Sequence, residues 1–300
     1  MEQPVPQIDI DSPNAVQTRR RVLLWGALLS AAVLLLLLVF LLLSGKPTND
    51  PQKGSSETTL TTAPEETTSP IPANPFAPDD FQLENGYLTC TAAESILGID
   101  VSGYQKKIDW QQVKAAGIQF AIIRVGGRGW GTAGTLYADN YAQENYLGAK
   151  EAGIQVGVYF YSQAISVEEA REEANYVLAL IKDWELDYPI VYDWEYVSAE
   201  ARTAKMDART LTDCTKAFCQ TVENAGYAPM IYFNPSQSRD LLYLEELLEY
   251  PFGLAMYQNT LEYPHRVDMW QYTRTGTVPG IQGNVDINLY FPHNEQQSGS

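Results

Sequence analysis

The pattern of apolar and polar residues divides the chain into three parts. A long apolar run without a charged residue lies near the N-terminus, at 22–43, and a polar stretch rich in Thr, Ser, Pro and Glu follows it. From about residue 83, short runs rich in β-branched and aromatic residues alternate with segments of helical periodicity. The pattern therefore predicts one folded domain that is preceded by appendages.

The short apolar runs predict eight β-strands, at 97–101, 120–125, 155–161, 189–195, 229–233, 254–258, 268–272 and 284–288. Helices are expected between the earlier strands, at 109–116, 137–152, 167–184 and 210–225. This alternation favours parallel strands with right-handed crossovers, and eight strands favour a closed barrel. Because the last three strands are joined by short links, we expect an α/β fold of irregular type, a TIM-like β/α barrel.

The run at 22–43 is long enough to cross a bilayer, which takes about 20 apolar residues, whereas a signal-peptide core has about 7 to 15. The arginines at 19–21 should remain cytoplasmic. We therefore predict a single-pass protein of the cell membrane. Its parts are a cytoplasmic tail (1–21), a transmembrane helix (22–43), a disordered linker (44–82), an extracellular barrel (83–293) and a flexible tail (294–300). A cleaved signal peptide is the alternative.

Composition excludes several classes of function. The net charge of −17 and the pI near 4.5 argue against nucleic acid as a partner, because phosphate binding needs clustered Lys and Arg. Two distant histidines, His265 and His293, give little support to a zinc site or a Ser-His-Asp triad. The three cysteines form no evident framework, although a bridge from Cys90 stays open. We expect no metal, no cofactor and a monomer.

Two carboxylates spaced at i and i+2, Asp193 and Glu195, end the fourth predicted strand. Side chains alternate along a strand, so both acids should point to one side and Trp194 to the other. Like charges held close together in a partly buried site push their pKa values apart, which suits acid-assisted bond cleavage. The alternative interpretation is a strand that merely ends in two solvated acids.

Two further acids belong to the same rim of the predicted barrel. Asp100 ends the first strand, and Asp286 lies in the last, which a closed barrel places beside the first. Since chemistry in such barrels sits at the C-terminal ends of the strands, we expect four carboxylates to line one pit.

Aromatic side chains on the strands near this rim suggest that the ligand is a saccharide, because sugar rings pack their apolar faces on aromatic rings. A packing role within the barrel is expected for about half of them. The candidate substrate-binding residues are Tyr159, Tyr161, Arg124, Tyr192, Tyr232, Trp270, Tyr272 and Trp130. Trp130 lies in a formal G-x-G-x-x-G at 129–134, which we interpret as a mobile loop at the barrel mouth, since no acid for a ribose follows the next strand.

An ordered set of motifs resembles the Chalaropsis-type lysozymes, glycoside hydrolase family 25. The motifs are Gly98-Ile-Asp-Val-Ser-Gly-Tyr104, Ile108-Asp-Trp110, Phe120-Ala-Ile-Ile-Arg124, Gly157-Val-Tyr159, Tyr192-Asp-Trp-Glu195, Trp270-Gln-Tyr272 and Val285-Asp-Ile-Asn288. The resemblance implies an irregular barrel of eight strands and about five helices. It also implies cleavage of the β-1,4 bond between N-acetylmuramic acid and N-acetylglucosamine in the glycan strands of peptidoglycan. Glu195 would be the proton donor and Asp193 its partner, with Asp100 and Asp286 completing the acidic site.

Breaking a glycosidic bond needs a proton for the leaving oxygen and negative charge near the developing oxocarbenium ion. Asp193 and Glu195 are too close for an ordinary inverting pair, so our hypothesis is that the 2-acetamido group of the substrate attacks, with Asp193 or Asp286 stabilising the cyclic intermediate. A chitinase-like hydrolase of family 18 is a weaker alternative, because its D-x-x-D-x-D-x-E run is absent. A non-catalytic, tethered wall-binding barrel is the alternative from another class.

Overall fold

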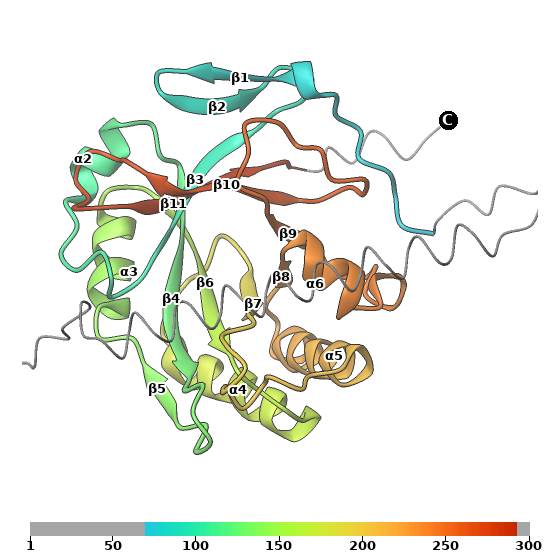
Figure 1. Ribbon diagram of the computed structural model, residues 1–300. Helices are drawn as coiled ribbons and strands as arrows, with labels where there is room; N and C mark the ends of the chain where they lie inside the picture. The colour runs from blue at the N-terminus through green and yellow to red at the C-terminus, as the bar shows by residue number, and fades with distance from the viewer. Residues whose placement is uncertain (1–69, 293–300) are drawn as a thin grey trace, which may run out of the picture. The chain divides into compact units, whose positions relative to one another are not determined.

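The computed structural model describes residues 70–292, and within them eight strands close into a barrel (Figure 1). The barrel strands are β3 (Ile96–Val101), β4 (Phe120–Arg128), β6 (Gln155–Ser162), β7 (Ile190–Trp194), β8 (Pro229–Phe233), β9 (Phe252–Ala255), β10 (Met269–Gly276) and β11 (Val285–Tyr290). Their order is β3-β11-β10-β9-β8-β7-β6-β4, and a parallel pairing of β3 with β4 closes the ring. All eight predicted strands are therefore present, and the closed barrel is confirmed.

The direction of the last strand differs from the prediction of parallel strands. β11 runs antiparallel to both of its neighbours, β10 and β3. A parallel crossover needs roughly a dozen residues or more, whereas the link at 277–284 is shorter and turns sharply at Gly280 and Gly283, both with positive φ. The chain therefore turns back as a hairpin, which puts the start of β11 at the same rim as the end of β3.

The helices cover the outside of the barrel, as Figure 1 shows for α3, α4 and α5. They are α2 (Trp110–Ala115), α3 (Ala142–Glu151), α4 (Val167–Leu180), α5 (Ala208–Asn224) and the short α6 (Pro235–Asp240), with 3-10 turns at Pro78–Asp80 and Leu244–Glu246. Side chains of Asp109, Ser166 and Asp207 cap three of these helices by accepting a backbone N–H bond.

One predicted helix begins later than expected. The helical pattern at 137–152 starts only at Ala142, because residues Leu136–Ala138 form the edge strand β5, which pairs antiparallel with β4. The pairing places β5 against Gly126, where a Cβ atom would lie 2.3 Å from the Tyr137 carbonyl oxygen. Only glycine allows the two backbones to approach this closely, and the periodicity of apolar residues at 137–152 does not predict such a strand pairing.

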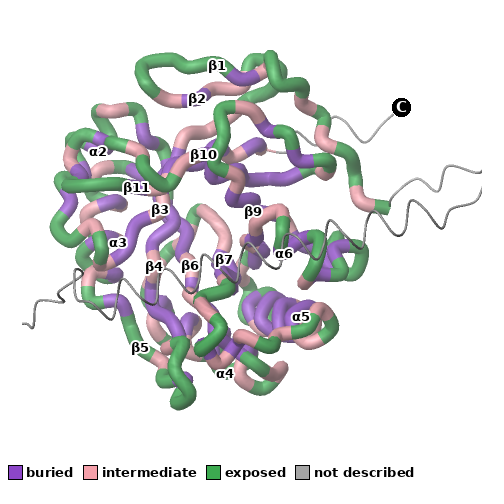
Figure 2. Tube along the Cα trace, in the orientation of Figure 1, coloured by how far each residue is buried: buried purple, intermediate pink, exposed green. Residues whose placement is uncertain are grey.

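Two separate layers of apolar side chains form the core. A large cluster fills the space between the strands and the helices, and a small one fills the barrel interior with Phe120, Ile122, Val191, Met230 and Met269. Figure 2 shows the buried segments concentrated in the barrel strands and α5, whereas β1 (Phe81–Glu84) and β5 are mostly exposed. Side chains of this small inner cluster form the bottom of the cavity at the barrel mouth.

The folded part begins before the predicted boundary at 82/83. Asn74 donates a hydrogen bond from Nδ2 to the Leu261 carbonyl, and Phe76 packs on Phe81 and Phe291. β1 then forms a hairpin with β2 (Tyr87–Cys90). The boundary is thus wrong by about a dozen residues, because a few aromatic contacts hold a stretch whose composition resembles a linker.

The predicted transmembrane helix at 22–43 and most of the predicted linker lie outside the described residues. Among residues 70–292, no helix is long and apolar enough to cross a membrane. The three cysteines are all free thiols, and Cys214 and Cys219 are buried in α5.

Candidate active site

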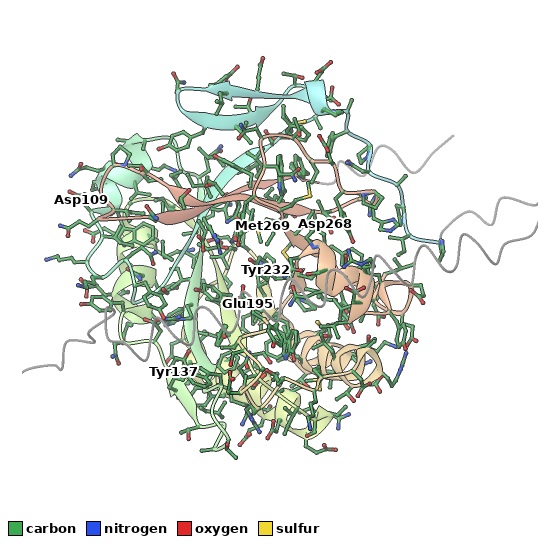
Figure 3. All side chains as sticks on the ribbon, viewed as in Figure 1. Asp109, Tyr137, Glu195, Tyr232, Asp268 and Met269 are labelled. Carbon is green, nitrogen blue, oxygen red and sulfur yellow. The ribbon has the colours of Figure 1, made fainter. Side chains whose placement is uncertain are left out.

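The barrel mouth holds a cavity of about 610 Å³. Four carboxylates from three strand ends line it: Asp100, Asp193, Glu195 and Asp286. Met269 and Ile122, from the inner apolar cluster, form part of its floor. In Figure 3, Glu195 and Tyr232 lie near the centre of the barrel, far from Asp109 at its edge. The structure thus brings together all four acids that the sequence proposed as one group.

Strand alternation positions the acids of β7. Asp193 and Glu195 line the cavity, whereas Trp194 is buried on the other face of the strand, within the large outer cluster. The Trp194 carbonyl accepts a hydrogen bond of 2.5 Å from Gln237 Nε2. The i, i+2 spacing therefore places both carboxylates in the cavity, as predicted.

Asp100 and Asp286 face each other across the β3–β11 ladder, as directly paired residues. Asn288 Nδ2 donates to Asp100 Oδ1 at 2.7 Å, and Gln271 Nε2 donates to Asp100 Oδ2 at 2.5 Å. Gln271 Oε1 in turn accepts from the Tyr232 hydroxyl at 3.0 Å. Two amide side chains thus hold both oxygens of one carboxylate.

Gln271 and Asn288 were not among the predicted site residues, although both belong to the motifs that resemble family 25. Each is a polar side chain flanked on both sides by apolar or aromatic residues, and both are buried. Buried polar groups are nearly always hydrogen-bonded, so their positions alone would have indicated a nearby partner in the barrel interior.

Burial is the main reason why the acids have raised pKa values. It lifts the pKa of Asp100 to about 8, with the charge of Asp286 adding to it and the bonds from Asn288 and Gln271 opposing it. Burial also raises the pKa of Asp286 to about 6, against the effect of Arg274. We expected like charge to be the main cause, but its contribution is second to desolvation.

The two acids of β7 are affected in the same way. Burial, followed by the charges of Glu195 and Asp100, raises the Asp193 pKa well above its ordinary value, and Arg124 opposes this. Burial and then Asp286 raise the pKa of Glu195. The site therefore retains protons at a pH where solvated carboxyls have lost them, as a proton donor requires.

Five of the eight candidate substrate-binding residues line the cavity. They are Arg124, Trp130, Tyr159, Tyr161 and Tyr232. Trp130 is 52% exposed, so its ring is open to a ligand. Arg124 is held by an ion pair with Asp139 at 2.7 Å and lies 5.1 Å from the centre of the Tyr104 ring. Tyr104 and Tyr137, which were not among the predicted site residues, also line the cavity.

The other three candidates, Tyr192, Trp270 and Tyr272, do not line the cavity, and their prediction is wrong. Tyr192 is buried against Phe218 of α5, and Trp270 Nε1 donates to the Met256 carbonyl. The cause is alternation: Asp193 and Gln271 take the inward positions, so the residues directly beside them face outward.

No group of three or more His, Cys, Asp or Glu side chains within residues 70–292 is arranged to hold a metal ion. The chemistry that this site offers is acid-assisted cleavage by carboxyls beside aromatic faces, on a β/α barrel. That combination defines the class of glycoside hydrolases.

Comparison with known proteins specifies the family. The profile of glycosyl hydrolases family 25 matches residues 99–281. Protein YegX of Escherichia coli K12 is 31% identical over 217 residues, which are 66% of this chain and 71% of YegX. Lysozyme M1 of Streptomyces globisporus is 27% identical, with 65% of this chain and 67% of that protein aligned. The chain belongs to glycoside hydrolase family 25, as its motifs had indicated.

Among solved structures, the modular autolysin LytC from Streptococcus pneumoniae, in complex with a synthetic peptidoglycan ligand, superposes with a TM-score of 0.60 at 28% identity. The aligned part is 70% of this chain but only 50% of LytC, so this chain spans about half of that protein.

The raised pKa values predict how stability depends on pH. Asp100 and Asp286 have folded-state pKa values of about 8 and about 6, above the ordinary 3.8. The folded state therefore holds protons that the unfolded chain has released, and stability falls as pH rises through this window. Asp286→Asn removes one such acid and the like charge beside Asp100. We expect its free energy of unfolding to fall less between pH 5 and pH 8 than that of the wild type.

Urea unfolding of the full chain in mild detergent, followed by tryptophan fluorescence at several pH values, measures this slope. Asp183→Asn is the matched control, because Asp183 is exposed and distant from the cavity. It should keep the wild-type slope. Equal slopes for Asp286→Asn and the wild type would contradict the electrostatic account.

Proposed function

We propose that this protein hydrolyses peptidoglycan, cleaving the β-1,4 bond between N-acetylmuramic acid and N-acetylglucosamine. The observation that carries the proposal is the gathering of four carboxylates with raised pKa values in one cavity bordered by Tyr and Trp rings. Its support from relatives is that Lysozyme M1 and an autolytic lysozyme of Clostridium acetobutylicum are similar to this chain. LytC, similar in structure, was solved with a peptidoglycan ligand.

In this proposal Glu195 is the general acid. It is less buried than Asp193, which places it nearer to the solvent side of the cavity, where a glycosidic oxygen can reach it. Its pKa is raised, so the carboxyl carries a proton to give. As the C1–O bond breaks, that proton passes to the leaving oxygen, and Glu195 becomes the base that later takes a proton from water.

The second part of the mechanism is attack by the substrate itself. The carbonyl oxygen of the 2-acetamido group bonds to C1 from the side opposite to the leaving group and forms a positively charged oxazolinium ring. Asp193, beside Glu195 on β7, is the residue to balance that charge. Although burial favours its protonated form in the free protein, a neighbouring cation shifts it toward the carboxylate. Water then attacks C1 and gives a proton to Glu195, while the bond from C1 to the acetamido oxygen breaks; the acetamido group is regenerated and the β configuration is restored.

We also propose that the protein is anchored in the cell membrane by residues 22–43, with the barrel outside the cell. The run carries no charged residue and follows three arginines, and the polar stretch after it gives the barrel reach. Tethering raises the local concentration of the enzyme at its substrate layer, which matters because the net charge of −17 gives no attraction toward anionic wall polymers.

The general-acid role predicts the effect of Glu195→Gln. The amide keeps the shape but has no proton to give, so we expect a folded protein with turnover lowered by about 10²- to 10⁴-fold. Clearing of purified cell walls, with zymograms as a second assay, measures the loss. Glu223→Gln, an exposed acid at the end of α5, is the control and should retain wild-type activity. An inactive wild type would instead favour a non-catalytic wall-binding barrel.

The attacking acetamido group predicts the stereochemistry of the product. Two displacements at C1 give net retention, so the first reducing end released from a peptidoglycan fragment should be the β-anomer. Proton NMR of the anomeric signals within the first minutes, before mutarotation, distinguishes the two forms. If the α-anomer is formed directly, the water attacks without a cyclic intermediate and this mechanism is wrong.

The anchor predicts how the protein partitions in cells. The full-length protein should stay in the membrane pellet after an alkaline carbonate wash, and protease added to spheroplasts should degrade the barrel. Deletion of residues 22–43 should leave the barrel in the cytoplasm, out of reach of the protease. A mature form whose mass lacks residues before about 44 would show a cleaved signal peptide instead.

A further inference from the structure

Glu195 lies immediately beyond the hydrogen-bonded part of its strand. β7 ends at Trp194, and its pairings end at Trp194 with β6 and at Asp193 with β8. No residue beyond Trp194 is paired in the ladder, and the Glu195 carbonyl oxygen accepts its bond from a side chain. Some other contact has to determine where its carboxyl points.

A buried side-chain amide makes that contact. Gln163, directly after β6, has no exposed surface, and its Nε2 donates to the Glu195 carbonyl at 2.9 Å and to the Ser162 carbonyl at 2.8 Å. Its Oε1 accepts from the Thr203 hydroxyl at 2.8 Å. Both donors and the acceptor of this one amide thus join three chain segments, and one of them carries the proposed general acid.

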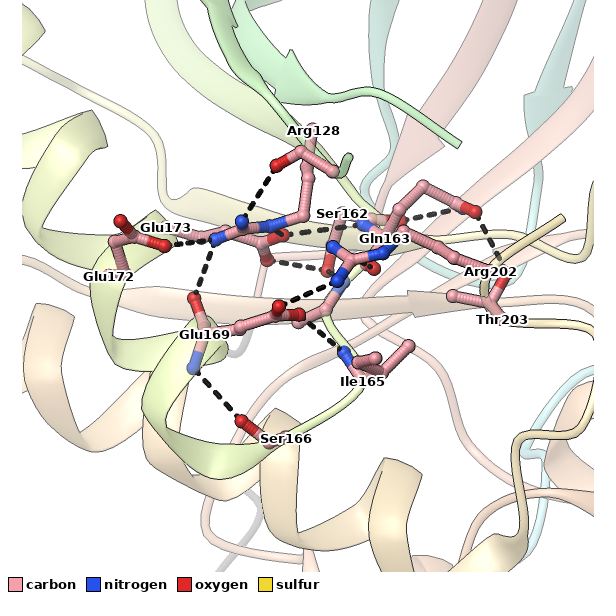
Figure 4. Close-up of polar contacts among 12 residues, drawn as sticks. Arg128, Ser162, Gln163, Ile165, Ser166, Glu169, Glu172, Glu173, Arg202 and Thr203 are labelled. Atoms are coloured by element: carbon pink, nitrogen blue, oxygen red, sulfur yellow. Dashed lines mark hydrogen bonds and ion pairs between the residues drawn. The ribbon is translucent and has the colours of Figure 1, made fainter. Parts of the chain in front are cut away.

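The Gln163 backbone is fixed from beneath by buried charges (Figure 4). Its N–H donates to Glu173 Oε1, which also pairs with Arg128 Nε at 2.7 Å, while the Ser162 hydroxyl lies 2.6 Å from Glu173 Oε2. Glu173 is fully buried in α4 and Arg128 ends β4. Separating Arg128 from Glu173 would leave a buried charge unpaired, which is strongly unfavourable, so this ion pair holds the Gln163 backbone in place.

The same assembly holds the loops on both sides of the cavity. Arg202 donates from Nη1 to the Gln163 carbonyl, and its backbone N–H donates to the Trp130 carbonyl at 2.9 Å. Arg202 Nη2 also pairs with Glu169 at 2.6 Å. Arg202, in the segment after Glu195, therefore binds both the Gln163 backbone and the loop that carries Trp130.

We infer that Gln163 is a positioning residue for Glu195. Its amide holds the Glu195 carbonyl where the strand pairing ends, so that the Glu195 carboxyl stays in the cavity near Asp286 and does not turn out to solvent. The inference rests on the proposed function, because it takes Glu195 as the general acid. Gln163 itself does not line the cavity and acts through the backbone of Glu195.

The test is Gln163→Met, which has a similar length but no amide. The freed Glu195 should spend more time in water, where the desolvation that raises its pKa is smaller. We expect the titration midpoint of Glu195, followed by carbon NMR of labelled Glu with Glu195→Gln for assignment, to move down. We also expect kcat to fall about 10- to 100-fold, with KM within about threefold, because a small misplacement of a catalytic group affects the chemical step.

The pH profile separates positioning from mere loss of stability. The alkaline limb of kcat, where the general acid loses its proton, should move to lower pH in Gln163→Met. Thr212→Val is the matched control: it removes a buried hydroxyl that accepts the Tyr243 N–H in the helical layer. This variant should lower the unfolding temperature but leave the Glu195 midpoint and the alkaline limb in place. An unchanged midpoint and kcat in Gln163→Met would overturn the inference.

If Gln163→Met does not fold, Thr203→Val takes its place: it removes one bond to the amide, and the Glu195 midpoint should move in the same direction by less, whereas no movement refutes the inference. The NMR titration needs no substrate, so it tests the role of Gln163 even if the wild type fails to cleave peptidoglycan. Failure of the proposed function and failure of this inference are thus distinguishable.

Discussion

The whole site depends on the pairing of Asp100 with Asp286 where the first and last barrel strands meet. Like charges directly opposite each other in a ladder are unfavourable. Here burial keeps them partly protonated, and two amides bind both oxygens of Asp100. The pairing that closes the barrel therefore also forms the acidic cavity. Burying the two acids side by side is unfavourable to folding, and the same burial raises their pKa values and so retains protons near Glu195.

Much of the fold follows from local pattern. The eight apolar runs became the eight barrel strands, and the i, i+2 spacing placed Asp193 and Glu195 in one cavity. The position of Asp286 beside Asp100 followed from closure alone, and it held although β11 runs opposite to the prediction. The reason is that Asp286 is close to the start of a short strand, and reversing that strand moves its first residues to the same rim.

Other features depend on three-dimensional contacts that residue type does not encode. Alternation beside Asp193 already places Tyr192 outside the cavity, whereas the sequence alone does not show which strand face Trp270 and Tyr272 occupy, because a register shift of one residue reverses it. Residues before 83 have the composition of a linker, yet Phe76 docks on rings from 81 and 291. In the sequence, nothing distinguishes Gln163 from the other glutamines. Its role becomes visible only in the structure, where the pairing of β7 ends at Trp194 and the Gln163 amide binds the Glu195 carbonyl.

The hairpin of β10 and β11 has a consequence for biosynthesis. β3 has to wait for β11, nearly two hundred positions later, before it gains its second neighbour, so the ring stays open while most of the polypeptide is being made. Until then Asp100 faces no partner acid and the mouth does not exist as an enclosed space. A chain that ends before β11 would therefore lack both the closed ring and one of the four carboxylates of the cavity.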